Sequence, residues 1–213
     1  MKIKMEFDLK TAQLMCSRLC HDLVGAAGAV NAGLELVEET QTINSEAFTM
    51  TKKSAKEVTR RLMFFRAAFG LGGTEGFDVP SLGKIVKNFM EGTNINLYWP
   101  DSAPGTAAAP GEAAKLLLNL CLLGAECLPR GGDLHADIAI LDDGVGIAIS
   151  ADGTGAILRD DLRNALQGGA NSNDLTARNV HAYLVSLLAL RFNQKVEYQQ
   201  FENSVKFATL VPV

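Results

Sequence analysis

Apolar residues recur at spacings of three and four over the first third of the chain, and this pattern limits what the chain can fold into. Such spacing places them on one face of a helix. An unbroken stripe of this length predicts a single long helix whose apolar face another helix must cover. Asp8, with Thr11 as a second candidate, is suited to cap its first turn. The stripe consists of Leu9, Ala12, Cys16, Leu19, Leu23, Ala26, Val30, Leu34 and Val37.

A second helix is predicted from Ser45, its expected cap, to about Phe69, after a short loop at residues 40–44. A short loop between two long helices favours an antiparallel hairpin. Because one hairpin buries its stripe poorly, two hairpins from two chains are expected to form a four-helix bundle, which predicts a homodimer. The buried stripe of the second helix is expected to contain Ala47, Met50, Ser54, Val58, Leu62, Phe65 and Phe69, and its polar face Lys52, Lys53, Lys56, Arg60 and Arg61.

A glycine-rich segment at residues 70–76 marks the boundary between two domains. We expect a helical-hairpin domain at 1–71, a linker at 72–79 and a second domain at 80–213, giving an α+β chain overall. The second domain mixes helical and alternating patterns. Its predicted helices are 81–90, 111–128, 160–167 and 180–192, and its predicted strands are 95–99, 134–141, 145–150, 196–201 and 205–211.

Composition excludes several classes of protein. The net charge of −4 lacks the basic surplus of a general nucleic-acid binder. No apolar run is long enough to span a bilayer and no signal-peptide core is present, so a cytoplasmic protein without membrane contact is expected. In a reducing cytosol, the four cysteines are expected to be buried, reduced thiols. A metal site of Cys16, Cys20 and His21 is disfavoured, because Cys20 and His21 point about 100° apart on a helix.

His21 lies two residues from Leu19 and from Leu23, both on the stripe. A two-residue step turns a helix by about 200°, so His21 should face solvent from the middle of the helix. Asp22 follows it and could accept one ring N–H, while Arg18, one turn earlier, could pair with a phosphoryl group. The residues expected on the same face are Ser17, Arg18, Val24, Gly25, Gly28 and Ala32.

Gly25, Gly28 and Gly33 interrupt this helix, and each costs roughly 1 kcal/mol relative to alanine. Two explanations stay open. Small residues beside an exposed imidazole would let a partner protein dock closely, or they would allow tight packing within the bundle.

The sequence LCHDLVGA at residues 19–26 resembles the H-box of sensor histidine kinases, with Ala26 where a proline is usual. The longer strings CSRLCHDLVG at 16–25 and NAGLEL at 31–36 resemble the ChpT-type histidine phosphotransferases more specifically. The resemblance covers nearly the whole chain. It implies an N-terminal helical hairpin that forms a dimeric four-helix bundle, followed by a degenerate GHKL ATPase-like α/β sandwich.

The resemblance also implies a function. His21 would accept a phosphoryl group from the receiver domain of a hybrid histidine kinase and pass it to a response regulator in a phosphorelay. Asp22 and Arg18 would support the transfer, and Ser17, Val24, Gly25 and Gly28 would contact the receiver. No cofactor or metal is expected on this chain, because Mg²⁺ would come with the receiver.

The nucleotide-binding elements of the ATPase fold are expected to be damaged. Asn119 matches one N-box asparagine, but Lys115 occupies the position of the other. The pattern D-x-G-x-G matches residues 142–146 literally, yet the topology favours 151–155, where Ala151 replaces the aspartate that would accept from adenine. The segment 173–180, before the last helix, contains no glycine for a phosphate-binding turn. We therefore expect no ATP binding.

Two other functions stay open at this stage. Nucleotide binding through Asp142 would indicate an ATP-dependent histidine kinase, and partner binding that does not need His21 would indicate a dimeric scaffold. His135, in a predicted strand, and His181, at a helix start, are expected to be structural because they have no partners at ligand spacing.

Overall fold

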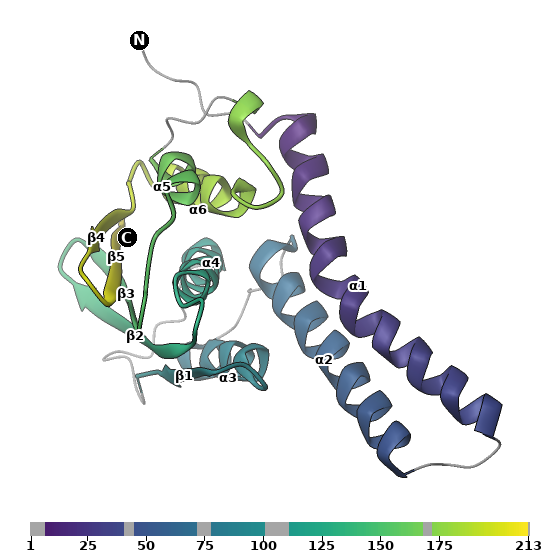
Figure 1. Ribbon diagram of the computed structural model, residues 1–213. Helices are drawn as coiled ribbons and strands as arrows, with labels where there is room; N and C mark the ends of the chain where they lie inside the picture. Colours follow the sequence, from purple (N-terminus) through teal and green to yellow (C-terminus); the bar gives the residue numbers. More distant parts are fainter. Residues whose placement is uncertain (1–6, 41–44, 72–77, 101–110, 168–171, 213) are drawn as a thin grey trace.

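The computed structural model describes residues 7–40, 45–71, 78–100, 111–167 and 172–212. Helix α1 (Leu9–Thr40) and helix α2 (Ser45–Phe69) run side by side in opposite directions, as predicted (Figure 1). Asp8 caps α1, because its carboxylate accepts the Thr11 backbone N–H at 2.8 Å and the Thr11 hydroxyl at 2.7 Å. These two hydrogen bonds lower the pKa of Asp8. The predicted loop at 41–44 lies outside the described residues.

The second part of the chain is a five-stranded sheet covered by helices, with strand order β1-β2-β3-β5-β4. Strand β1 pairs parallel to β2, and every other pair is antiparallel. The elements are α3 (Val79–Met90), β1 (Ile95–Tyr98), α4 (Gly111–Glu126), β2 (Gly132–Leu141), β3 (Gly144–Asp152), α5 (Asp160–Leu166), η1 (Ser172–Asp174), α6 (Val180–Leu190), β4 (Glu197–Gln200) and β5 (Ser204–Pro212).

The predicted helices and strands of this part are all present, with shifts at their ends. Strand β2 begins two residues before the predicted start at Leu134, because Gly132 pairs with Ile95 of β1. The φ of Gly132 is +143°, which favours glycine at this entry to the strand. The β2–β3 hairpin closes through Asp142 and Asp143, with Leu141 opposite Gly144, as the pattern predicted.

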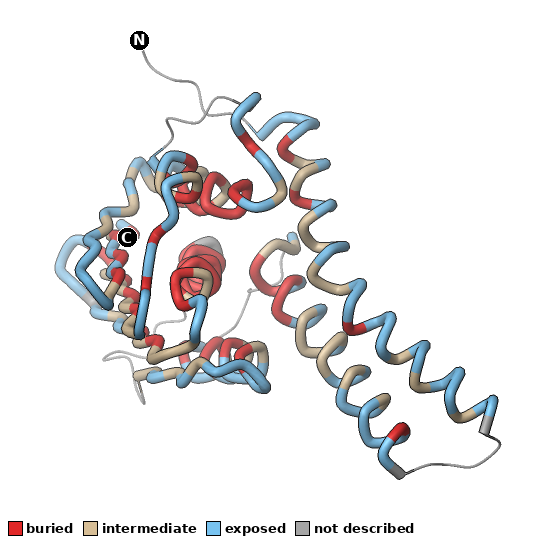
Figure 2. The backbone as a smooth tube through the Cα atoms, in the orientation of Figure 1, coloured by how far each residue is buried: buried red, intermediate tan, exposed pale blue. Residues whose placement is uncertain are grey.

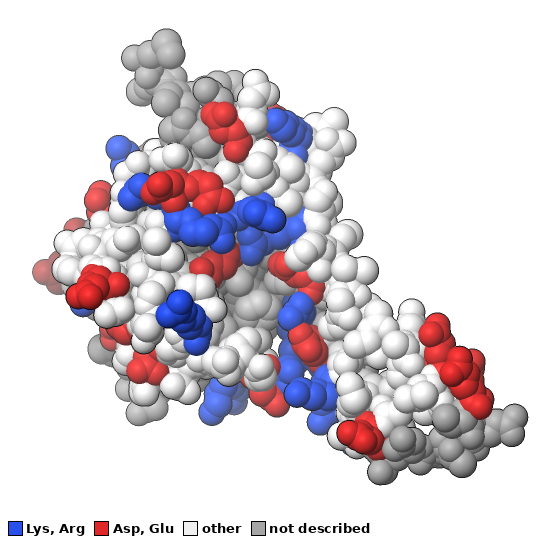
Figure 3. Space-filling view, viewed as in Figure 1, with Lys and Arg blue, Asp and Glu red and all other residues white. Residues whose placement is uncertain are grey.

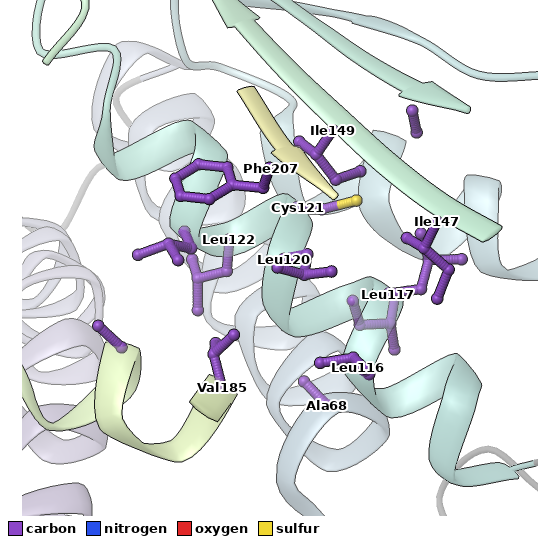
Figure 4. Close-up of a cluster of buried hydrophobic side chains, with 14 of the residues drawn as sticks. Ala68, Leu116, Leu117, Leu120, Cys121, Leu122, Ile147, Ile149, Val185 and Phe207 are labelled. Atoms are coloured by element: carbon purple, nitrogen blue, oxygen red, sulfur yellow. The ribbon is translucent and has the colours of Figure 1, made fainter. Parts of the chain in front are cut away.

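Helix α4 is the centre of the hydrophobic core (Figures 2 and 4). The sheet covers one side of it, and helices α2, α3 and α6 cover others, so apolar residues are buried around its whole circumference. In Figure 4, Leu117 and Cys121 of α4 lie near Ile147 and Ile149 of β3. The mainly apolar sequence of α4 is therefore that of a core helix.

The C-terminal turns of α2 join the hairpin to the sheet domain through aromatic packing. Phe64 is fully buried, and its ring stacks on Phe89 of α3 with 4.1 Å between centroids. Phe65 lies edge-on to Phe64 at 6.2 Å and Phe69 lies 5.8 Å from Phe65. Residues 72–77 of the expected linker at 72–79 lie outside the described residues, whereas Asp78 caps α3 and Val79 begins it. The domain limits 1–71 and 80–213 stay predictions.

Part of each apolar stripe is exposed in the single chain, as expected for one hairpin alone. In α1, Leu9 is 74% and Leu34 is 50% exposed, and in α2, Met50 is 65% and Leu62 is 50% exposed. The stripe of α1 is wider than the surface that α2 covers, so one flank stays open in the single chain. Within the described ranges, no helix has the length and apolar character needed to cross a membrane.

The cysteines divide into two pairs, which corrects the expectation that all four are buried. Cys121 and Cys127 are buried, and burial raises the pKa of the Cys127 thiol to about 12, so it stays protonated. Cys16 and Cys20 are exposed, because both lie on the open flank of α1. Among the described residues, no cluster of three or more potential metal ligands is present, Cys16, Cys20 and His21 included.

Candidate functional site

His21 projects from the middle of α1 into solvent, as predicted, with 86% of its side chain exposed. Its Nδ1 lies 3.3 Å from Oδ1 of Asp22, whose side chain is 30% exposed. A carboxylate at this position accepts Nδ1–H and leaves the lone pair on Nε2. The imidazole therefore presents its Nε2 atom to a partner, which suits it for nucleophilic attack.

Arg18 lies one turn before Asp22, but its side chain turns toward the sheet domain and is only 14% exposed. Its guanidinium approaches Asp22 Oδ2 at 3.6 Å and binds Glu126 Oε1 at 2.5 Å. It also donates to the backbone carbonyl of Arg178 at 3.4 Å. The prediction that Arg18 shares the exposed face of His21 is therefore wrong, because Glu126 at the end of α4 draws the guanidinium inward.

Arg61 of α2 fixes the backbone at the site. It donates a hydrogen bond to the carbonyl oxygen of Asp22, and its other amino group pairs with Glu57 at 2.5 Å. A carbonyl inside a helix already accepts its own helical N–H, so this second donor ties α1 to α2 beside His21. The sequence pattern assigned Arg61 only to a polar face, since no local signal shows a contact between two helices.

A buried polar network continues from Arg18 into the core. Glu126 Oε1 lies 3.2 Å from Nδ1 of His181, which is fully buried at the start of α6. The other ring nitrogen, Nε2, lies 3.1 Å from Oδ1 of Asn119. The expectation that His181 has no partners is wrong, because both of its ring nitrogens face side chains of α4 that are distant in sequence.

The predicted docking residues beside His21 lie on the open face of α1. Ser17, Val24, Gly25 and Gly28 are all exposed, Val24 by 65%. A Cβ at Gly25 or Gly28 would meet no atom of this chain within 4 Å. Packing within the single chain therefore explains neither glycine, so the molecule that uses this clearance must be a second chain, either a receiver or the other hairpin of the bundle.

Gly33 is explained by tight packing between α1 and α2, because a Cβ there would collide with the side chain of Thr51 in α2. The Thr51 hydroxyl donates to the Ala47 carbonyl at 2.8 Å, so it cannot move away without losing that bond.

We expect Gly28→Ala to raise the free energy of unfolding by about 0.5–1 kcal/mol through helix propensity. Gly33→Ala should lower it by about 1–2 kcal/mol through overpacking. Urea denaturation of both variants measures the difference, and equal shifts would contradict it.

The positions matching nucleotide-binding elements are occupied by internal contacts. The Asn119 amide donates to the carbonyls of Ala68 at 2.9 Å and Lys115 at 2.8 Å. Ala151 is buried near the end of β3, the second strand of the hairpin, whereas Asp142 lies in the turn at the opposite end. The topology thus agrees with the alignment that assigns Ala151 to the adenine-reading position.

The turn before α6 is closed by its own side chains. Asn179 Oδ1 accepts the Thr176 backbone N–H at 2.7 Å and its hydroxyl at 3.2 Å, while Asn179 Nδ2 donates to the Asp174 carbonyl at 3.2 Å. His135 lies elsewhere, on β2, where it stacks on Tyr98 with 4.3 Å between centroids. It therefore takes no part in the site around His21.

Lys and Arg side chains gather in the middle of one face of the molecule, between the sheet domain and α1 (Figure 3). Arg159 and Arg163 contribute to the charge of the sheet domain, but each is paired with an aspartate, Asp161 and Asp160 respectively. The Arg159 pair lowers the pKa of Asp161 through a side-chain hydrogen bond. Exposed pairs such as these add little to stability.

The chain matches known proteins along almost its whole length. The model of the family "Histidine phosphotransferase C-terminal domain" matches residues 80–204. The protein phosphotransferase ChpT of Brucella abortus (strain 2308) is 29% identical over 202 residues, which are 94% of this chain and 95% of that protein. A solved bacterial phosphotransferase has a TM-score of 0.81 at 28% identity, covering 94% of this chain and 96% of its own. The chain therefore belongs to the histidine phosphotransferase C-terminal domain family, and it is a ChpT-type histidine phosphotransferase.

Proposed function

We propose that His21 carries the phosphoryl group of the phosphorelay, taking it from a receiver aspartate and passing it to a second receiver. The observation that carries this proposal is the exposed imidazole whose Nδ1 faces Asp22 at 3.3 Å. Nε2 attacks phosphorus as the bond from phosphorus to the aspartyl oxygen breaks, and the aspartate leaves as a free carboxylate. The reverse reaction with another receiver aspartate regenerates the neutral imidazole. The chain mainly supplies position and charge.

Asp22 and Arg18 have different roles in this proposal. Asp22 accepts Nδ1–H, so the nucleophilic lone pair is on Nε2, and it balances the charge that develops on the ring during transfer. Arg18 holds Asp22 from the side away from the receiver, because its guanidinium lies between Asp22 and Glu126. Direct pairing of Arg18 with the phosphoryl group does not fit this orientation.

Receiver domains are the proposed partners, docking on the open face of α1. The surface around His21 consists mostly of small side chains that project little from the helix: Ser17, Val24, Gly25 and Gly28. We expect Gly28→Leu to raise the melting temperature slightly, since leucine is a better helix former than glycine and no atom of the chain lies near its Cβ, but to weaken receiver binding about tenfold or more. Titration calorimetry with a receiver domain measures the affinity of the wild type and of Gly28→Leu. Unchanged affinity would contradict docking on this face.

A homodimer is the proposed assembly, built from the open flanks of both helices. Phe48, Ala55 and Leu62 of α2 are exposed and recur every seven residues, the spacing at which helices pack in a bundle. Leu9, Cys16 and Leu34 form the matching flank of α1. A second hairpin covering both flanks would complete the four-helix bundle.

Leu62→Glu is expected to convert the dimer to a monomer, because it places a charge on this apolar flank. Met63→Glu is the matched control, since Met63 is 59% exposed on the neighbouring lysine-bearing side of the same helix. Light scattering across a dilution series measures the mass of each. A dimeric Leu62→Glu variant, or a monomeric Met63→Glu variant, would show that the interface lies elsewhere.

We further propose that the chain does not use ATP. Asn119 has both amide hydrogens committed to backbone carbonyls, Ala151 offers no acceptor for adenine, and the turn before α6 is closed by Asn179. Each of these arrangements removes an element that a nucleotide would need. The phosphoryl group must then come from a phosphorylated receiver.

Radiolabelled phosphate distinguishes these sources. The protein is incubated with labelled ATP alone, and separately with a receiver domain already labelled on its aspartate. Label gained only from the receiver is the expected result. Label gained from ATP alone would indicate a kinase and would overturn the assignment of Ala151, and no label from a competent receiver would leave a dimeric scaffold.

A further inference from the structure

Glu126 occupies a position at which three elements meet. It is the last residue of α4, its carboxylate binds Arg18 of α1 at 2.5 Å, and the same oxygen lies 3.2 Å from His181 of α6. The Glu126 side chain is only 16% exposed and that of Arg18 only 14%. A carboxylate so shielded from water must be neutralised by its neighbours.

Hydrogen bonding determines where the protons of His181 lie. The Asn119 amide nitrogen donates to two carbonyl oxygens, of Ala68 and Lys115, which uses both of its hydrogens and fixes the orientation of the amide. Its Oδ1 atom, which can only accept, therefore faces Nε2 of His181 at 3.1 Å. Nε2 of His181 must carry a hydrogen.

The other ring nitrogen of His181 faces a carboxylate. Nδ1 lies at ion-pair distance from Glu126, outside strict hydrogen-bond geometry, and has no hydrogen-bond partner among the described residues. A lone pair on Nδ1 would point at a negatively charged oxygen 3.2 Å away, whereas an N–H there is attracted to it. A hydrogen on Nδ1 as well as on Nε2 is the arrangement that suits both neighbours of this fully buried ring.

The charges around Glu126 agree with this assignment. Burial by itself would raise the pKa of Glu126, but the close approach and charge of His181 and the charges of Arg18 and Arg159 together lower it. The carboxylate is also at the C-terminal end of α4, where the helix dipole favours nearby cations. Two cations from different elements therefore bind one carboxylate.

We propose that Glu126 and His181 are positioning residues of the phosphotransfer site: the buried imidazolium holds the Glu126 carboxylate, Glu126 holds Arg18, and Arg18 holds Asp22 against His21. This inference rests on the proposed function of His21. The ring of His181 also lies edge-on to Phe69 at the end of α2, with 6.0 Å between centroids. The network thus sets α1 and α2 relative to the sheet domain and orients the site from behind.

The protonation of His181 is tested on the wild-type protein by nitrogen-15 NMR of the histidine rings near pH 7.5. The spectrum of His181→Gln identifies the resonances of His181. We expect both of its ring nitrogens to resonate as protonated imidazolium nitrogens. One protonated and one unprotonated nitrogen, as in a neutral ring, would overturn the inference without any bearing on the phosphotransfer reaction.

Glu126→Gln tests the positioning role. The amide keeps the shape but binds Arg18 less strongly, so we expect the maximal transfer rate from a phosphorylated receiver to fall about tenfold or more. The receiver concentration for half-maximal rate should stay about constant, because Glu126 is remote from the docking face. Glu91→Gln is the matched control, since Glu91 binds Arg60 at 2.7 Å in an ion pair that is not part of the network of Glu126.

The outcomes separate this inference from the function on which it rests. A wild-type protein that takes no label from a competent receiver contradicts the proposed function itself. A wild-type protein that takes label, with a Glu126→Gln variant that transfers at the same maximal rate, contradicts only the positioning role. Thermal denaturation of each variant verifies folding, and if Glu126→Gln does not fold, the NMR measurement on the wild type still decides the inference.

Discussion

His21→Ala is expected to abolish phosphoryl transfer from a phosphorylated receiver while leaving the fold intact. The side chain is 86% exposed, and its contact with Asp22 is the one that places Nδ1. Alanine is the best helix former, so α1 loses nothing in helix propensity. The nucleophile itself disappears, and no neighbouring group on this face replaces an imidazole nitrogen.

The measurement is the transfer of label from a phosphorylated receiver to each of three proteins: the wild type, His21→Ala and His135→Ala. His135 is the matched control, because it is a second histidine in the sheet domain that stacks on Tyr98. The His135→Ala variant should take label like the wild type, and circular dichroism should show equal helix content in all three. Label on His21→Ala would assign the phosphoryl group to another residue.

Phe64→Ala is expected to lower the free energy of unfolding by about 3–5 kcal/mol, the usual cost of removing a buried phenyl ring. Phe64 is fully buried and packs between α2 and α3, with Phe89 stacked 4.1 Å away and Phe65 edge-on at 6.2 Å. The ring joins the hairpin that carries His21 to the sheet domain. Its removal leaves a cavity at this junction that neighbouring helices cannot close fully.

Chemical denaturation measures the free energy of unfolding of Phe64→Ala and of Phe201→Ala. The comparison shows whether the loss comes from the burial of Phe64 or from removing any phenylalanine. Phe201 follows β4 and is 54% exposed, so its truncation should cost less than about 1 kcal/mol. A similar small loss in both variants would mean that the aromatic cluster does not hold the hairpin to the sheet domain. A loss of receiver transfer in Phe64→Ala at temperatures where it stays folded would show that the junction also positions His21.

Local patterns in the sequence were enough to predict most of the fold. The stripes of α1 and α2 predicted both helices and the Asp8 cap, and alternation predicted the strands on either side of Asp142 and Asp143. These features depend on residues within a few positions of one another. The parallel pairing of β1 with β2 depends on a distant contact, and nothing in the local pattern indicated it.

The candidate site was predicted in part for the same reason. Helix geometry alone predicts that His21 faces solvent, and Asp22 lies beside it because it is the next residue. The sequence is sufficient for both predictions. Arg18 was placed on the wrong face, because its orientation depends on Glu126, which is more than 100 residues away in the chain. Arg61, Glu126 and His181 were not recognised, since side chains that meet only in the folded chain leave no spacing to detect.

Only the structure distinguishes Gly33 from the other two glycines of this helix. Gly33 needs its small size to pass Thr51, while Gly25 and Gly28 have open space in front of them. In the sequence, all three are equal interruptions of a helical pattern. The sequence also does not show which cysteines are buried. Cys16 lies on the apolar stripe, but on the flank of α1 that this chain leaves uncovered.

The chemical form of the phosphorylated protein tests the central claim most directly. The wild-type protein is phosphorylated by a labelled receiver, purified under alkaline conditions that preserve phosphohistidine, and examined by mass spectrometry and phosphorus-31 NMR. We expect one acid-labile phosphoryl group, on the peptide that contains His21, attached to Nε2 because Asp22 engages Nδ1. A phosphoryl group on any other residue, or on Nδ1 of His21, would contradict the account.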